Sequence, residues 1–192
     1  MPSLALVSRF AVAFSATLAL AAVLGNFLLA RSRNAPIRAE KRSPVATGTM
    51  LAFFGALYVV LRFRLGEIYA PKAAMVLGLV LLAAGTVGNI LGRLALAGNW
   101  GDHVVMYRDH QLVASGIYRW VRHPLYASLI WMASGASLIF GNPLALAMVL
   151  VIFLPAMIYR ARQEEAILSA TFPNYAQYRR RTGMFLPMPW LK

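Results

Sequence analysis

The sequence contains no cysteine and few acidic residues. Among 192 residues there are six Asp and Glu against 19 Lys and Arg. Without cysteine, disulfides, thiolate nucleophiles and zinc–thiolate sites are excluded. Three histidines remain, His103, His110 and His123, but no two of them lie at i, i+4 spacing with a carboxylate between them. We therefore expect no metal site.

Charged residues of either sign are also scarce, at 13% of the chain, whereas hydrophobic residues make up 60%. Ordinary soluble domains are nearer half apolar and a quarter charged, so this composition predicts an integral-membrane protein. The length allows one domain of short helices and leaves no room for a separate soluble Rossmann domain. Any cofactor must then bind within the membrane fold itself.

Five apolar segments are separated by charged or proline-containing links. They lie at about 10–30, 45–61, 73–91, 125–140 and 143–159. The first is long enough to cross a membrane, and it exceeds the apolar core of about 7–15 residues in a cleaved signal peptide, so we expect a retained helix. The fold class predicted is all-α, an integral-membrane bundle of about five transmembrane helices with a cytoplasmic cofactor pocket formed by the C-terminal half.

We expect a single membrane domain over residues 1–192. Residues 1–92 would form an N-terminal three-helix part, and residues 93–192 a catalytic part containing a helical hairpin at 125–159. Gly141-Asn142 followed by Pro143 predicts the tight turn of this hairpin. Glycines recur in the third segment, at Gly78, Gly85, Gly88 and Gly92. They predict close helix packing, with the ordinary tolerance of membrane helices for glycine as the alternative.

The basic residues flank the apolar segments unevenly. Five crossings would place Arg9, Arg62, Arg64 and Lys72 on one side and the remaining Lys and Arg residues on the other. The positive-inside rule then predicts an external N-terminus and a cytoplasmic site in a multi-pass protein. We expect these residues to contact anionic lipid headgroups rather than nucleic acid.

Two polar blocks interrupt this apolar pattern. The first reads His-Gln-Leu-Val-Ala-Ser-Gly-Ile-Tyr-Arg-Trp-Val-Arg-His-Pro-Leu-Tyr from His110 to Tyr126, and the second reads Arg-Ala-Arg-Gln-Glu-Glu from Arg160 to Glu165. Polar groups gathered at a membrane border indicate a ligand or a function. Arg160 and Glu164 are four residues apart and share a helix face, and the alternative role for them is a surface ion pair worth under about 1 kcal/mol.

Two residues of the first block predict its backbone conformation. Gly116 suits a turn with positive φ, and Pro124 suits the first turn of a helix, whose N–H groups favour an anionic group of a ligand. An aromatic belt at the membrane border is the alternative reading of Tyr118, Trp120 and Tyr126. We interpret Arg119 and Arg122, like the basic run 179–181, as headgroup anchors.

Together the two blocks resemble the isoprenylcysteine carboxyl methyltransferase family, integral-membrane enzymes that use S-adenosyl-L-methionine and release S-adenosyl-L-homocysteine. The resemblance covers roughly residues 103–187. It implies cofactor-binding roles for ten residues, namely His110, Gln111, Leu112, Val113, Tyr118, His123, Pro124, Leu125, Tyr126 and Glu164. It also implies that Arg160 binds the acceptor carboxylate and that Arg160 and Glu164 are catalytic. The chain departs from the family at Met106, where a polar residue is expected, and at Pro173, where glycine is common.

The resemblance implies methyl transfer to a lipophilic acceptor, with the carboxylate of a protein-linked isoprenylcysteine or an analogue as the leading candidate. Its partners would be a prenylated or lipophilic small-molecule substrate and membrane lipids, with no nucleic acid and no metal. Methylation of a phospholipid or another amine is the alternative enzyme, for which His123 or Glu165 would serve as base. Membrane sterol-type reductases share part of the pattern but have more crossings. A non-catalytic lipid-binding scaffold is the alternative from another class.

Overall fold

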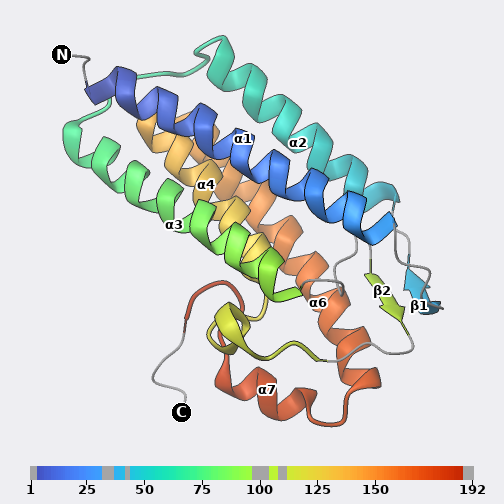
Figure 1. Cartoon of the computed structure of the whole chain (residues 1–192). Coiled ribbons are helices and arrows are strands. Elements are labelled where there is room, and N and C mark those ends of the chain that lie inside the picture. Colours follow the sequence, from blue (N-terminus) through green and yellow to red (C-terminus); the bar gives the residue numbers. More distant parts are fainter. Residues whose placement is uncertain (1–3, 32–36, 42–43, 97–103, 108–111, 188–192) are drawn as a thin grey trace.

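The computed structural model describes residues 4–31, 37–41, 44–96, 104–107 and 112–187, with side chains described at 6–21, 48–96 and 112–187. Its long helices pack into one bundle (Figure 1). The bundle consists of α1 (Leu4–Arg31), α2 (Pro44–Arg62), α3 (Lys72–Leu96), α4 (Pro124–Ile139), and a continuous helix made of α5 (Pro143–Met148), the π-helical turn η3 (Val149–Phe153) and α6 (Leu154–Thr171). Two short helices, η2 (Gly116–Arg119) and α7 (Tyr175–Arg181), lie at the end of the bundle nearest the C-terminus.

The bundle is helical, as the apolar segments predict, and a small sheet is added to it. Strand β1 (Ile37–Lys41) pairs in antiparallel fashion with β2 (Val104–Tyr107). Figure 1 shows this sheet at the same end of the bundle as α7. The sequence did not predict it, because the two strands are far apart in the chain and pairing between distant segments leaves no local pattern.

The last long helix extends beyond its predicted end near residue 159, to Thr171. The residues after 159 are polar but have good helix propensity. The apolar segment therefore ends near residue 159, whereas the helix continues. Pro155 lies inside this helix and has no N–H to donate. The π-helical turn directly precedes it, a local irregularity that relieves the clash with the preceding turn. Arg160, Glu164 and Glu165 are thereby held on a rigid helix.

Helices α3 and α4 approach closely where both carry glycine. A Cβ added to Gly135 would lie 2.6 Å from the carbonyl oxygen of Gly78, and one added to Gly78 would lie 2.7 Å from that of Gly135. Gly85 and Gly92 also leave no room for a side chain, which confirms the packing role expected of them. Gly88 is different, since the nearest atom to an added Cβ would be 3.8 Å away.

The apolar core joins α2 to the C-terminal half. Phe53 of α2 stacks on Phe153 with ring centroids 4.4 Å apart, and both are buried. The same cluster includes Ile130 of α4 and Met157 of α6. The core therefore draws on both halves of the sequence, and the single domain over residues 1–192 stays a prediction.

The turn between α4 and α5 has the predicted geometry. Gly141 adopts a φ of 58°, and the Asn142 side chain caps α5 by accepting a hydrogen bond of 2.8 Å from the Ala145 N–H. Pro143 is the first residue of the helix. The Nδ2 of Asn142 also donates to the Leu65 carbonyl at 2.9 Å, which ties the turn to the link between α2 and α3.

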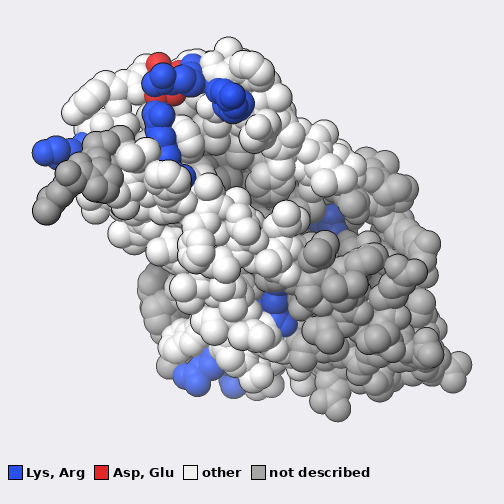
Figure 2. Space-filling view, turned by 45° about the horizontal axis from the view of Figure 1, so that its top comes forward, with Lys and Arg blue, Asp and Glu red and all other residues white. Residues whose placement is uncertain are grey.

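Charged side chains gather at this end of the bundle. Glu67 in the α2–α3 link pairs with Arg9 at 3.1 Å and with Arg64 at 2.7 Å. Figure 2 shows acidic atoms surrounded by basic atoms at the top of the view, with a largely uncharged surface below them. Arg9 and Arg64 were expected on the same side of the membrane, and the structure brings them to one carboxylate.

Among the described residues, two helices are long and apolar enough to cross a membrane by themselves, Lys72–Leu96 and Pro143–Thr171. Three shorter apolar helices, Leu6–Ala21, Gly48–Arg62 and Pro124–Ile139, accompany them. Large apolar side chains face outward on the bundle, among them Leu51 and Val151, which are 72% and 73% exposed. Five crossings stay a prediction.

Candidate active site

The first polar block is held by a segment far along the chain. The N–H groups of Arg122 and His123 donate to the carbonyls of Gly183 and Met184 at 2.8 and 3.1 Å. Gly116 opens η2 with a φ of 58°, which confirms the expected turn. His123 is the N-cap of α4. These backbone hydrogen bonds hold the side chains of Arg122 and His123, which precede α4, next to α6.

Tyr126, Arg160 and Glu164 meet between α4 and α6. The Tyr126 hydroxyl donates to a Glu164 carboxylate oxygen and accepts a hydrogen bond of 2.8 Å from Nε of Arg160. Arg160 Nε also lies 3.8 Å from Glu164 Oε1, as expected for residues four apart on one helix. The guanidinium carbon stands 5.7 Å from the centre of the Tyr126 ring. The structure thus brings together three residues that the sequence places in two separate blocks.

His123 lies between the two adjacent carboxylates. Its Nδ1 is 3.4 Å from Glu164 Oε2 and its Nε2 is 3.2 Å from Glu165 Oε1. Burial by itself would lower the pKa of His123, but the hydrogen bonds to Glu164 and Glu165 outweigh it and the pKa is raised above 6.5. An imidazolium donates from both nitrogens, which suits this bridging position.

Glu165 is the centre of a buried charged network. Its side chain is 5% exposed, accepts from Arg122 Nε at 2.8 Å and lies 3.5 Å from Nε of Arg179. Arg122 also donates to the backbone carbonyls of Arg179 and Thr182. The interpretation of Arg122 as a headgroup anchor was therefore wrong, because its side chain is 9% exposed and binds protein groups. The network fastens α7 to the start of α4.

The aromatic residues of the first block separate into two kinds. Tyr118 is buried, and its carbonyl accepts a hydrogen bond of 2.7 Å from the hydroxyl of Tyr178 on α7. Burial, followed by the proximity of Tyr178 and Glu164, raises the pKa of Tyr118. Trp120 is 38% exposed, with the Arg119 guanidinium 4.9 Å from its ring centre. A membrane-border position fits Trp120 and Arg119, whereas Tyr118 belongs to the interior beside the site.

The remaining predicted cofactor residues have different positions. Pro124 and Leu125 pack against α3 at Gly92, so a ligand would meet their backbone rather than their side chains. Leu112 and Val113 are half-buried on the approach to η2. His110 and Gln111, like the side chain of Met106, lie outside the described residues. No group of three potential metal ligands occurs in the described part of the chain.

The site suits a small molecule that carries a positive charge. The Glu164 side chain is 24% exposed and stands beside the stacked rings of His123 and Tyr126, whose centres are 5.7 Å apart. The Glu164 carboxylate and the Tyr126 ring attract a cation, and the first-turn N–H groups of α4 would attract a carboxylate of the same molecule. Arg122 was not expected from the sequence to help build this site, and Glu165 was expected there only as the base of the alternative amine methylation. The position of Glu165 directly after Glu164 was the one available signal.

A family model describes the same part of the chain. Residues 76–170, about half of the sequence, match the model of the isoprenylcysteine carboxyl methyltransferase (ICMT) family. The chain belongs to this family. The matched range contains α4, α6 and all the side chains that meet around Glu164, and it leaves α1 and α2 outside.

One protein similar to this chain is a protein-S-isoprenylcysteine O-methyltransferase of Saccharomyces cerevisiae, which is 33% identical over 122 residues. The aligned residues cover 62% of this chain and 51% of that protein. A cobalt-zinc-cadmium resistance protein, CzcN, of Cupriavidus metallidurans is 35% identical over 118 residues, covering 59% of this chain and 49% of that protein. The chain spans about half the length of these relatives.

A solved structure shares the fold. The structure of the eukaryotic intramembrane Ras methyltransferase ICMT superposes with a TM-score of 0.54 at 25% identity, covering 79% of this chain and 54% of that chain. The fold of this chain is therefore similar to that of an integral-membrane helical protein. The likeness covers 79% of the chain and so extends beyond the residues that match the family model.

Proposed function

We propose that this protein transfers a methyl group from S-adenosyl-L-methionine to the carboxylate of a protein-linked isoprenylcysteine or a similar lipid-linked acid. The observation that carries the proposal is the convergence of Tyr126, Arg160 and Glu164 on one another. The names of the relatives described above point to the same reaction. The cytoplasmic orientation of the site and the five crossings are part of this proposal and are supported by the distribution of basic residues.

The described residues fit this cofactor. S-adenosyl-L-methionine, when bound, would supply a methyl group on a positively charged sulfur, and the charge would disappear as the methyl leaves. Glu164 and the face of Tyr126 would hold its cationic part. The N-terminus of α4 would hold its carboxylate, with Leu112, Val113 and Tyr118 on the side of η2.

Arg160 would bind and orient the acceptor. A guanidinium and a carboxylate form two parallel hydrogen bonds, which fix the direction of the nucleophilic oxygen. Tyr126 holds Arg160 in place through the 2.8 Å hydrogen bond to Nε. A carboxylate with a pKa of about 3.5 is already ionised, so this reaction needs no base. Exclusion of water around Arg160 and the bound carboxylate would then raise the reactivity of the carboxylate oxygen.

Amine methylation is the less suitable reaction because it requires a base. Both ring nitrogens of His123 face carboxylates, Nδ1 that of Glu164 at 3.4 Å and Nε2 that of Glu165 at 3.2 Å, so His123 is poorly placed to accept a proton from an amine. Glu165, the other candidate, is engaged by Arg122, His123 and Arg179. Both groups have structural partners, and a carboxylate acceptor leaves those partners undisturbed.

Calorimetry with S-adenosyl-L-homocysteine on the purified protein tests the cofactor site. We expect Glu164→Ala to weaken binding by about 10- to 100-fold, as for a lost charge-assisted hydrogen bond. Glu67→Ala is the matched control, since it removes a carboxylate at the opposite end of the bundle. No binding by the wild type, or equal binding by the two variants, would refute the proposal. Methyl transfer to N-acetyl-S-farnesylcysteine compared with phosphatidylethanolamine then identifies the acceptor.

A further inference from the structure

Arg160 extends from the site towards α2. Its Nε donates to the Tyr126 hydroxyl, while its Nη1 donates to the thioether sulfur of Met50 at 3.4 Å. Met50 precedes Arg160 by 110 residues and lies outside residues 76–170, which match the family model. Neither the motif blocks nor the family match gives this residue a role.

The contact with Met50 is a weak one for a guanidinium. A thioether is a poor acceptor, whereas a carboxylate accepts charge-assisted hydrogen bonds from two nitrogens at once. The Arg160 side chain is 14% exposed, so few water molecules can reach it. A carboxylate arriving at Nη1 would therefore displace the sulfur readily.

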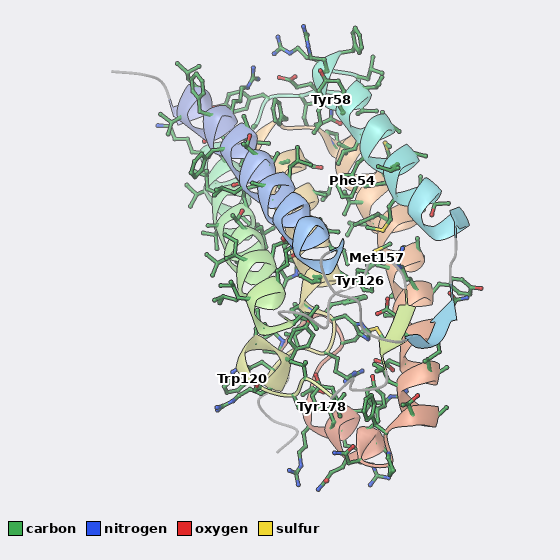
Figure 3. All side chains as sticks on the ribbon, turned by 45° about the vertical axis from the view of Figure 1, so that its right-hand side comes forward. Phe54, Tyr58, Trp120, Tyr126, Met157 and Tyr178 are labelled. Carbon is green, nitrogen blue, oxygen red and sulfur yellow. The ribbon has the colours of Figure 1, made fainter. Side chains whose placement is uncertain are left out.

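The surroundings of Met50 are apolar. Met50 packs against the core cluster that contains Phe53 and Met157. Figure 3 shows Tyr58, Phe54, Met157 and Tyr126 following one another from the upper end of the view to the level of the site. Phe54 and Tyr126 pack against the core cluster that contains Met157, and Tyr58, about one helical turn from Phe54 on α2, is 65% exposed. A charged group at Nη1 would thus have apolar side chains beside it, as an acid on a lipid chain requires.

We propose that the acceptor carboxylate binds Arg160 Nη1 in place of the Met50 sulfur, and that α2 forms one wall of the acceptor site. Met50 is then a specificity-determining residue. The neutral side chain at position 50 admits an acid, whereas a negatively charged side chain there would repel it. The inference rests on the proposed function, because it takes the acceptor to be a lipid-linked carboxylate.

The lack of cysteine permits a direct test of occupancy. Met50→Cys introduces the one thiol of the chain, and its alkylation by a maleimide can be followed by mass spectrometry. N-acetyl-S-farnesylcysteine should slow alkylation about tenfold at about ten times its Kd, and its methyl ester should protect much less. Leu51→Cys is the control, because Leu51 is 72% exposed on the next position of α2. Equal protection of the thiols in the two variants, or equal protection by acid and ester, would overturn the inference.

Charge at position 50 provides the second test. Met50→Glu places a carboxylate against Arg160 and should raise the KM for N-acetyl-S-farnesylcysteine by about 10- to 100-fold, while Met50→Gln, of equal size, should raise it far less. Equal KM values for the two variants would contradict the inference.

Calorimetry with S-adenosyl-L-homocysteine separates failure of the acceptor site from failure of the proposed function. If the wild-type protein binds this ligand but the thiol of the Met50→Cys variant is not protected, the acceptor site alone is overturned. If the wild-type protein does not bind it, the proposed function is overturned.

Discussion

The buried ion pair between Arg122 and Glu165 should contribute strongly to stability, whereas the pair between Arg179 and Glu165 should contribute little. Both pairs share the same carboxylate, but the Arg122 side chain is 9% exposed at 2.8 Å, whereas that of Arg179 is 60% exposed at 3.5 Å. Removing one member of a buried pair leaves the other charge without water or a partner, which costs about 3–5 kcal/mol. An exposed pair is worth about 0.2–1 kcal/mol.

Double-mutant cycles isolate each contact. We would combine Glu165→Met with Arg122→Met in one cycle and with Arg179→Met in another. Because residues in contact within one buried network couple by up to about 3 kcal/mol, the first cycle should give a coupling energy of about 2–3 kcal/mol. The second should give less than about 1 kcal/mol. The cycles also cancel the bonds from Arg122 to the carbonyls of Arg179 and Thr182, which both Arg122 variants lose.

The assay is reversible unfolding of the detergent-solubilised protein in increasing sodium dodecyl sulfate, followed by far-ultraviolet circular dichroism. The free energy of unfolding is obtained for the wild type, the single variants and the double variants. A coupling energy for Arg122 that is no larger than that for Arg179, or below about 0.5 kcal/mol, would refute the reasoning that burial determines the strength of these pairs.

Two further predictions concern pH and packing. The pKa of His123 is raised above 6.5, so its charge stabilises the folded protein fully below that pH, and the contribution is lost as the pH rises through the raised value. The melting temperature of the wild type should therefore decline relative to that of His123→Gln as the pH rises above about 6.5, and a constant difference would contradict this. Gly135→Ala should destabilise the protein by about 1–3 kcal/mol, because its Cβ would lie 2.6 Å from the Gly78 carbonyl oxygen. The Cβ of Gly88→Ala would make only ordinary van der Waals contact, with the nearest atom 3.8 Å away, so this variant should be neutral or stabilising by up to about 1 kcal/mol. Equal losses of stability for the two variants in an unfolding titration would exclude the packing argument.

Local signals in the sequence determined much of the helical framework. Apolar content placed the long helices, and Pro124 and Pro143 marked the starts of two of them because proline fits the first turn. Gly116 and Gly141 marked turns that need positive φ. The spacing of Arg160 and Glu164 placed them on one helix face. Each of these features depends on residues close together in the chain.

Tertiary structure alone decided how distant groups are paired. The sequence could not show that Arg122 turns inward to Glu165 and the carbonyl of Thr182, since an arginine at a membrane border more often faces headgroups. Nor could it show that Arg160 touches Met50 across the bundle. The sequence by itself thus indicated which polar residues could carry chemistry. Their partners depended on which helices pack side by side. The strength of an interaction between two charges depends on their distance and burial and not on their separation along the chain.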